Sequence, residues 1–172
     1  PADPADPVAA EPAAPPAVVI DIDAPDELKT LLERYLDLSR LGTLGRGRAL
    51  SDTELTRLID ATPAEVRALL ETEGYFAPEV SIVREPPTAI GAPERVRLKL
   101  KPGPRTIVRR ADVEVEGALA RAVDAGDLLA QKTLDELRSR WPMKPGTPFR
   151  NPAWASAKNS SLAQLRAAGY AS

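Results

Sequence analysis

The chain has 172 residues, 25 Asp and Glu, 23 Lys and Arg, and a net charge of −2, so it lacks the basic surplus of a general polyanion-binding protein. It contains no Cys and no His, which excludes disulfides, thiol catalysis and sites that use the commonest acid–base residue and metal ligand. Apolar residues make up 43 %, enough for a core, but no stretch approaches the roughly 20 apolar residues that span a membrane.

Residues 1–16 are predicted to form a linker. Twelve of these sixteen residues are Pro or Ala, and such a segment has little to bury and favours extended conformations. We expect a semi-stiff spacer; the alternative is a ligand for an aromatic groove. The chain starts without Met and without the pattern of a signal peptide, so we expect a processed or trimmed polypeptide.

The first folded elements are predicted to be a strand and a helix. Ala17–Asp23 is rich in β-branched residues and alternates near its end, which is typical of a strand. Pro25 and the two acids after it suit the first turn of a helix. The apolar stripe of that helix comprises Leu28, Leu31, Leu32, Tyr35 and Leu36. We expect the helix to stop at Gly42 and a loop to follow over Gly42–Arg48.

Two further helix starts carry the pattern of a capping box, a hydroxyl followed three residues later by Glu. Ser51 and Glu54 form the first pair, and Thr62 and Glu65 form the second. The sequence therefore predicts two separate helices, of which the second ends at Gly74.

Two strands are predicted next. Val80–Arg84 is short and β-branched, and Glu94–Lys101 alternates without a fault. We expect Val96, Leu98 and Leu100 to face the helices while Arg95, Arg97, Lys99 and Lys101 face water.

The second half of the chain starts a similar series. Ile107–Glu116 is predicted to be a strand, with Val113 and Val115 on one face. Thr133–Arg140 is predicted to be helical, and Asn151 and Pro152 favour a further helix with Asn as its cap. That helix should bury a stripe comprising Trp154, Ala157, Ser161, Leu165 and Ala168.

The two halves share a signature. The helical part of each ends in Gly-Tyr, at Gly74-Tyr75 and at Gly169-Tyr170, which are 95 positions apart. The strands that open the halves are 94 positions apart at Val19 and Val113. We interpret this as an internal repeat of one α/β (α+β) module, with the first copy over 17–103 and the second over 104–172. The second copy stops where the first continues into two strands.

A β-α-α-β-β module whose helical part ends in Gly-Tyr resembles the polypeptide-transport-associated (POTRA) domains of Omp85-family outer-membrane assembly proteins. Trp141–Phe149 (WPMKPGTPF), with Trp154, Lys158 and Leu165–Tyr170 (LRAAGY), is similar to a second domain of such a series. Leu98–Val108 (LKLKPGPRTIV) is similar to the junction between the first two domains. The resemblance covers about residues 17–172.

The resemblance implies a scaffold at the periplasmic face of the outer membrane of a Gram-negative bacterium. It implies unfolded outer-membrane client proteins, a TamB-like inner-membrane-anchored partner and a C-terminal barrel of the same chain as partners. It also implies a third module and that barrel after the present sequence. Because a strand with two helices has an open sheet edge, we expect 104–172 to be poorly ordered or completed by another chain.

The strand after the helices is the first candidate site. The resemblance implies a sheet whose central strand is the third in sequence, so this second strand would have a free edge that can accept an extended segment through backbone hydrogen bonds. The residues of this predicted partner-binding edge are Glu79, Val80, Ser81, Ile82, Val83 and Arg84. The alternative is an edge that binds nothing, with Glu79, Arg84 and Glu85 as protecting charges.

A cationic face is the second candidate. It consists of Arg95, Arg97, Lys99 and Lys101, extended by Arg105, Arg109 and Arg110. It suits an acidic partner or anionic head groups. The alternative, which the slightly acidic chain favours, is the solvated face of a half-buried sheet. The aromatic residues Tyr75, Phe76 and Tyr170 are predicted to pack in the core, and Trp141 and Trp154 to lie in the core or at a module interface.

No arrangement predicts catalysis, a cofactor or a metal site. Gly42–Arg48 lacks the Gly-Lys-Ser/Thr ending of a phosphate loop, and the strand acids Asp21, Asp23, Glu114 and Glu116 suit solvated faces. The alternative function is a winged-helix DNA-binding domain over Ser51–Lys101, with residues 63–73 as recognition helix. Against it, that helix carries Arg67 beside Glu65, Glu71 and Glu73, and such a helix repels phosphate.

Overall fold

The computed structural model describes residues 18–44 and 51–171, and only the backbone of 42–44. The predicted linker 1–16 and residues 45–48 of the predicted loop lie outside the described residues. The described part is a mixed α/β structure with three strands and six helices. The chain divides into two compact units, one comprising 1–63 and 80–100 and the other comprising 64–79 and 101–172. The predicted module boundary after residue 103 remains a prediction.

The first unit contains the sheet. Its strands are β1 (Val19–Asp23), β2 (Glu79–Glu85) and β3 (Arg95–Lys101), in the order β1-β3-β2. β3 is therefore central, as expected, and it pairs in parallel with β1, where Asp21 lies opposite Arg97 and Asp23 opposite Lys99. Along β3 every second residue is buried and the others are exposed, which confirms the predicted alternation.

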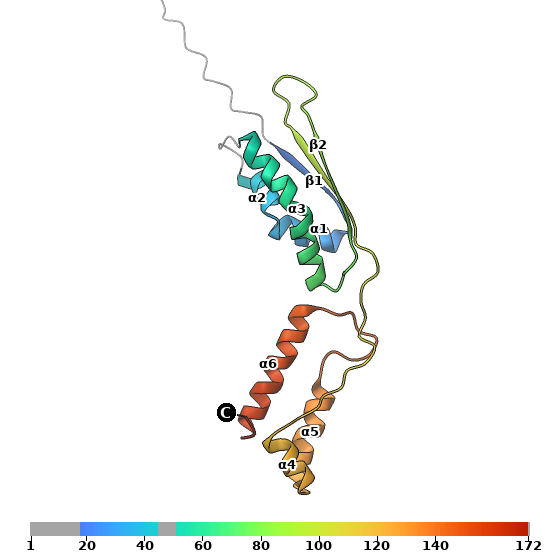
Figure 1. The fold of residues 1–172 in the computed structure, drawn as a ribbon, viewed down its shortest axis with the longest axis vertical. Helices are drawn as coiled ribbons and strands as arrows, with labels where there is room; N and C mark the ends of the chain where they lie inside the picture. The colour runs from blue at the N-terminus through green and yellow to red at the C-terminus, as the bar shows by residue number, and fades with distance from the viewer. Residues whose placement is uncertain (1–17, 45–50, 172) are drawn as a thin grey trace, which may run out of the picture. The chain divides into compact units, whose positions relative to one another are not determined.

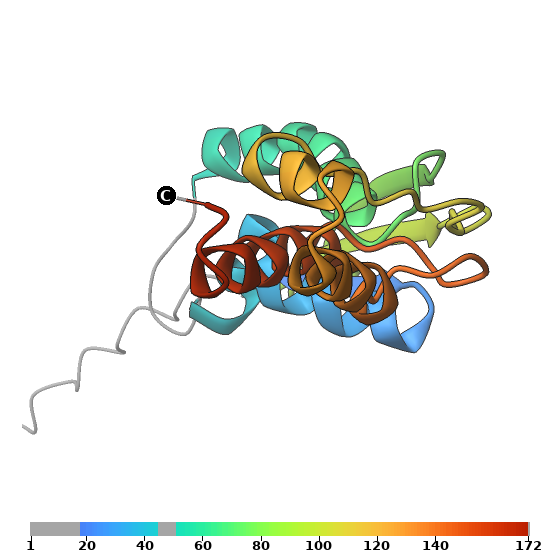
Figure 2. The ribbon, with the colours of Figure 1, turned by 90° about the horizontal axis from the view of Figure 1, so that it is seen from below.

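Helices cover one face of this sheet. They are α1 (Asp26–Tyr35), α2 (Asp37–Leu44) and the first part of α3 (Asp52–Thr72), and both ribbon views place them on the same side of the strands (Figures 1 and 2). The buried side chains of Leu38, Leu55, Leu58 and Val96 form the core between these layers. Burying one such side chain stabilises the fold by about 2 kcal/mol.

The predicted first helix is broken and extends past Gly42. α1 ends at Tyr35, Leu36 is extended with φ −70° and ψ 133°, and α2 then runs to Leu44. Leu36 and Leu38 are both fully buried, although residues two apart lie on nearly opposite faces of a straight helix. The break at Leu36 lets both side chains reach the core, whereas Tyr35, predicted to face inward, is 51 % exposed.

The two helices predicted over 51–74 are one helix of 21 residues. Ser51 is the expected cap and accepts a hydrogen bond from the Glu54 backbone N–H at 3.2 Å. Thr62 is not a cap, because its hydroxyl instead donates to the Leu58 carbonyl oxygen at 2.7 Å. Pro63 removes one helix hydrogen bond, at a cost of up to about 3 kcal/mol, but the buried stripe that includes Val66 continues beyond it and offsets that cost.

The second unit contains three helices of its own in the part of the chain that is described. They are α4 (Ala118–Asp124), α5 (Leu128–Arg140) and α6 (Asn151–Ala167). α5 begins five residues before the predicted start because Asp127 caps it, accepting hydrogen bonds from two backbone N–H groups. At α6, Asn151 is the first helical residue rather than the predicted cap, and Pro152 lies in the first turn.

The core of the second unit lies between these helices. Leu119, Ala130 and Leu137 are buried, and Leu165 and Tyr170 pack against them, so α4, α5 and α6 share one apolar cluster. Trp141 and Trp154 form an edge-to-face pair with ring centroids 5.5 Å apart.

Residues 107–116 do not form the predicted strand. Their only ladder contact in the described structure is a single antiparallel bridge between Ile107 and Pro148. A strand needs a partner for its backbone hydrogen bonds, and no strand of the second unit is present in 101–171 to supply them. Val113 and Val115 are both half-buried, so the alternation predicted the face of the segment that packs on the helices, but it did not predict a strand.

The chain that leaves α3 is fastened to the rest of the second unit at Gly74, which has a positive φ of 89°. The Gly74 carbonyl oxygen accepts a hydrogen bond from the Thr106 N–H at 2.8 Å, and the Phe149 N–H donates to the Thr106 carbonyl oxygen at 2.9 Å. Phe76 packs against the Phe149 ring, with centroids 6.2 Å apart, but it is 55 % exposed and so is not the predicted core residue. We call this the Gly74 junction.

Candidate functional site

β2 is an edge strand of the three-stranded sheet. It neighbours β3 on one side and no other strand among the described residues on the other side. Its burial alternates over most of its length, with Val80 and Ile82 half-buried and Ser81 and Val83 exposed. Ile82 packs against the core of the first unit, whereas Val83 exposes 54 % of its surface. The strand is therefore held from one face and one edge only, which is the arrangement that accepts an added strand.

Ion pairs hold both ends of β2. Glu79, at the start, pairs with Lys101 at 3.1 Å. Arg84, near the end, pairs with Glu94 and with Asp52 at the start of α3. The hydrogen bonds that Arg84 donates, first to Glu94 and then to Asp52, raise its pKa above the ordinary value. These contacts fix the strand against β3 and α3 while leaving the middle of its outer edge without a charge.

Neighbouring acids form ion pairs with two of the four cations of the predicted cationic face. Arg95, Arg97, Lys99 and Lys101 are all exposed, as expected. Arg97 lies 3.3 Å from Glu85 and 3.7 Å from Asp21, and Lys101 pairs with Glu79. Strand acids on both sides of β3 thus pair with Arg97 and Lys101, two of the four cations, as on a solvated sheet face. Binding of an acidic partner there stays a prediction.

Arg105 and Arg110, which were predicted to extend this face, form ion pairs with acidic residues of the second unit. Arg105 donates to the Glu73 carbonyl oxygen at 3.0 Å, lies 3.6 Å from the Glu73 carboxylate and stacks over the Tyr75 ring at 5.5 Å. Arg110 pairs with Asp112. The guanidinium groups at these positions therefore serve local structure.

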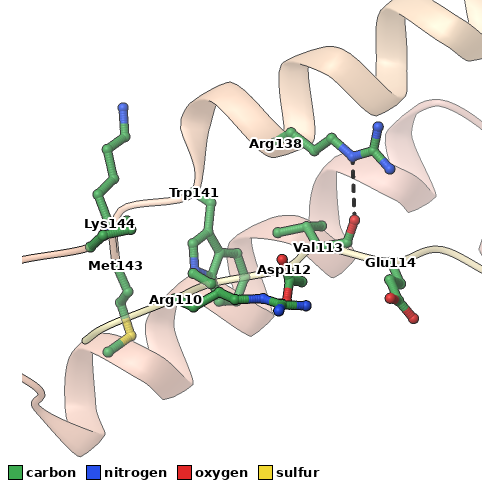
Figure 3. Close-up of a pocket in the computed structure, with 10 residues that line it drawn as sticks. Arg110, Asp112, Val113, Glu114, Arg138, Trp141, Met143 and Lys144 are labelled. Atoms are coloured by element: carbon green, nitrogen blue, oxygen red, sulfur yellow. Dashed lines mark hydrogen bonds and ion pairs between the residues drawn. The ribbon is translucent and has the colours of Figure 1, made fainter.

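Sequence reasoning missed a groove in the second unit, which we call the Trp141 groove. It has a volume of about 550 Å³ and is lined by residues 110–114 on one side and by Arg138, Trp141, Met143, Lys144 and Pro145 on the other. Figure 3 shows Arg138 donating to the Val113 carbonyl oxygen, a hydrogen bond of 3.3 Å. The indole N–H of Trp141 is shielded from solvent and has no hydrogen-bond partner among the described residues. The sequence feature nearest to this groove is the alternation of acidic and apolar residues in 112–116, part of which lines it.

β1 forms the second edge of the sheet, and in the described structure it pairs with β3 alone. Unlike β2, it carries charge at its middle, at Asp21, and charges on an edge discourage strand addition.

Across residues 18–41 and 51–171, no three acidic side chains gather in a way that could hold a metal ion. Within the same part of the chain, no helix combines the length and apolar character required to cross a bilayer. No protein-family model matches the chain, and no curated protein matches it.

Proposed function

We propose that the chain is a periplasmic scaffold of tandem POTRA-like modules from an outer-membrane assembly protein of the TamA kind. Its function is to bind client or partner polypeptides by β-strand augmentation, without catalysis. The observation that supports this most is the position of β2, an edge strand whose outer edge has no partner among the described residues. Backbone hydrogen bonding at such an edge tolerates many sequences, which suits a protein that handles diverse unfolded chains.

The order of elements in 18–101 supports the same proposal. A strand is followed by helices and then by two strands, with the last strand in the centre of the sheet. α1 and α2, separated by Leu36 alone, act as one bent helix, so the order corresponds to the β-α-α-β-β module. The second module would contribute its helices α4, α5 and α6.

The partners follow from the resemblance. They are unfolded outer-membrane proteins, a TamB-like partner anchored in the inner membrane, and a barrel formed by the same chain at the periplasmic face of the outer membrane. Reading the coding sequence beyond Ser172 tests this part. We expect two strands, a further module and then barrel segments of about 10 alternating residues each. A stop codon directly after Ser172 would overturn the barrel-anchored part and leave the edge-binding part standing.

The alternative of a winged-helix DNA-binding domain loses its basis. It required a turn between two helices near Thr62, and α3 continues through that position without one.

Site-specific cross-linking tests the edge. Because the chain has no Cys, single variants Ser81→Cys and Val83→Cys can carry a photo-cross-linker at β2. Thr53→Cys and Arg57→Cys, on the exposed side of α3, are the matched controls. The probe is a urea-unfolded outer-membrane β-barrel polypeptide diluted into buffer. We expect cross-links from β2 to exceed those from α3 several-fold; equal yields from both pairs would overturn the proposal.

A further inference from the structure

The connection between β2 and β3 presents the most exposed large apolar side chain among the described residues. Ile90 is as exposed as in an extended peptide, with a relative exposure of 107 %. The Ala92 N–H donates to the Ala89 carbonyl oxygen at 3.0 Å, and Gly91 has a φ of 82°. This is a type II turn, which prefers Gly at its third position and here holds Ile90 at its second. The connection extends past the ends of both strands (Figure 1).

The connection carries no charge. Residues 86–93 read Pro-Pro-Thr-Ala-Ile-Gly-Ala-Pro, in which Thr88 has the only polar side chain. About a quarter of the residues of an ordinary globular domain are charged, and nearly all of these lie at the surface. An exposed connection without one therefore departs from the usual pattern. The absence of charge also removes the largest cost of placing these residues in an apolar environment.

The backbone of the connection suits an environment that supplies few hydrogen-bond partners. Pro86, Pro87 and Pro93 have no N–H, and the Ala92 N–H is already bonded within the turn. In half of residues 86–93 the backbone donor is thus absent or satisfied. Each unsatisfied backbone group costs free energy in lipid, whereas a protein pocket can supply a partner for it. Few donors, a convex tip and no charge together favour a lipid surface over a protein pocket.

Charged residues stand at the base of the connection on both strands. They are Arg84 and Glu85 on one side and Glu94 and Arg95 on the other, two of each sign. Arg84 pairs with Glu94, which fastens the base of the hairpin. Four residues of chain separate Ile90 from this base at Glu94, a reach of up to about 13 Å. Apolar groups of interfacial elements lie about 5–10 Å deep, so Ile90 can reach that depth while the base stays among the head groups.

We propose that the tip of the β2–β3 connection, with Ile90 at its centre, inserts into the interfacial region of a lipid bilayer through apolar contact that needs no anionic lipid. The inference rests on the proposed function only for its location beside a membrane, and it concerns a different surface from the β2 edge. Burial of one Ile shifts a partition equilibrium about tenfold to a hundredfold. The tip therefore orients a chain that another attachment holds at the membrane, and it does not anchor the chain alone.

Fluorescence quenching from within the bilayer tests the insertion on the full chain. Because the chain has no Cys and no His, Thr88→Cys takes a single fluorophore beside the turn, and an added N-terminal histidine tag attaches the chain to phosphatidylcholine vesicles that contain a nickel-chelating lipid. Nitroxide groups on the acyl chains quench a fluorophore that enters the bilayer. We expect quenching when Ile90 is present, and Ile90→Asp should lower the ratio of inserted to free tip by about tenfold or more.

Leu128→Asp is the matched control. Leu128 is the first residue of α5 and is 85 % exposed, and an acid is favourable in the first turn of a helix. Quenching at residue 88 should be unchanged by this substitution. Equal quenching with and without Ile90→Asp would overturn the proposal, and so would an equal loss in Leu128→Asp. Insertion that occurs only after phosphatidylglycerol is added would also overturn it, because the cations of the chain would then drive the contact.

The quenching result and the cross-linking result at β2 are independent of each other. Insertion of the tip together with failed cross-linking at β2 would support this inference and overturn strand addition. Cross-linking at β2 without insertion of the tip would support strand addition and overturn this inference.

Discussion

Glu73 and Arg150 are 77 positions apart in sequence and form two parallel hydrogen bonds. The Arg150 Nε donates to Glu73 Oε2 at 2.7 Å, and a terminal guanidinium nitrogen donates to Oε1 at 3.0 Å. Arg105 reaches the same carboxylate, whose side chain is only 15 % exposed. The pair joins the end of α3 to the start of α6 within the second unit, next to the Gly74 junction.

Removing the charge of Glu73 should destabilise the second unit. Glu73→Gln leaves Arg150 and Arg105 without their shared anion, and because the carboxylate is mostly buried we expect a loss of about 1–2 kcal/mol in the free energy of unfolding. Urea unfolding followed by circular dichroism measures it. Lys132→Ala, at an exposed position of α5, should change the stability little, and an equal effect of the two substitutions would contradict the prediction.

The same pair predicts how stability depends on pH. The hydrogen bond from Arg150 lowers the pKa of Glu73 below its ordinary value of 4.5, with further lowering by the charges of Arg150 and Arg105, while burial opposes the shift. A carboxyl with a lowered folded-state pKa stabilises the fold fully above its ordinary pKa, and this contribution is lost as the pH falls through the folded-state value. Urea unfolding at several pH values between 7 and 3 measures the free energy of unfolding of both proteins. We expect the value for Glu73→Gln to approach that of the parent chain as the solution becomes acidic. Parallel curves for the two proteins would refute this assignment.

Gly74 should be irreplaceable for a steric reason as well as for its positive φ. A Cβ at this position would lie 2.5 Å from the Phe149 carbonyl oxygen. Gly126 provides a matched control, because its φ of 82° is similar and a Cβ there would meet nothing within 4 Å. We expect Gly126→Ala to cost about 1–2 kcal/mol from backbone strain, and Gly74→Ala to cost at least about 1 kcal/mol more from displacement of the Phe149 backbone. Thermal or urea unfolding measures both variants. Equal losses of stability in Gly74→Ala and Gly126→Ala would show that the contact between residue 74 and the Phe149 carbonyl oxygen is not tight.

Replacing Pro63 should stabilise α3. Pro63→Ala restores a backbone N–H inside the helix and removes the ring from the preceding turn, so we expect a gain of about 1–2 kcal/mol in the free energy of unfolding. Pro87→Ala, in the exposed connection between β2 and β3, is the control and should be neutral or slightly destabilising. A loss of stability in Pro63→Ala would mean that the packing of the half-buried ring outweighs the missing hydrogen bond.

Local patterns in the sequence predicted much of the first unit. The alternation over Arg95–Lys101 predicted both the strand and its buried face, because the period of two in side-chain direction is a property of any extended chain. The Ser51 cap was predicted for a similar reason, since its hydroxyl and the N–H of Glu54 are neighbours in sequence. The edge position of β2, which carries the candidate site, followed from the strand order that the resemblance implied and not from a local pattern.

Errors arose where distant residues decided the local structure. Thr62 and Glu65 carry the pattern of a helix start, but burial of Thr62 and Val66 on one continuous stripe keeps α3 intact. Ile107–Glu116 has the pattern of a strand, but a strand exists only where another backbone accepts and donates its hydrogen bonds.

The sequence by itself determined the alternation over Arg95–Lys101, the Ser51 cap and the two Gly-Tyr turns, because these depend on residues within a few positions of one another. Only the tertiary structure decided that Glu73 meets Arg150, that Trp141 borders a groove and that Arg97 is balanced by two acids. Such contacts join residues from separate elements, and their free energy depends on distance and burial in the folded chain, which no local pattern encodes.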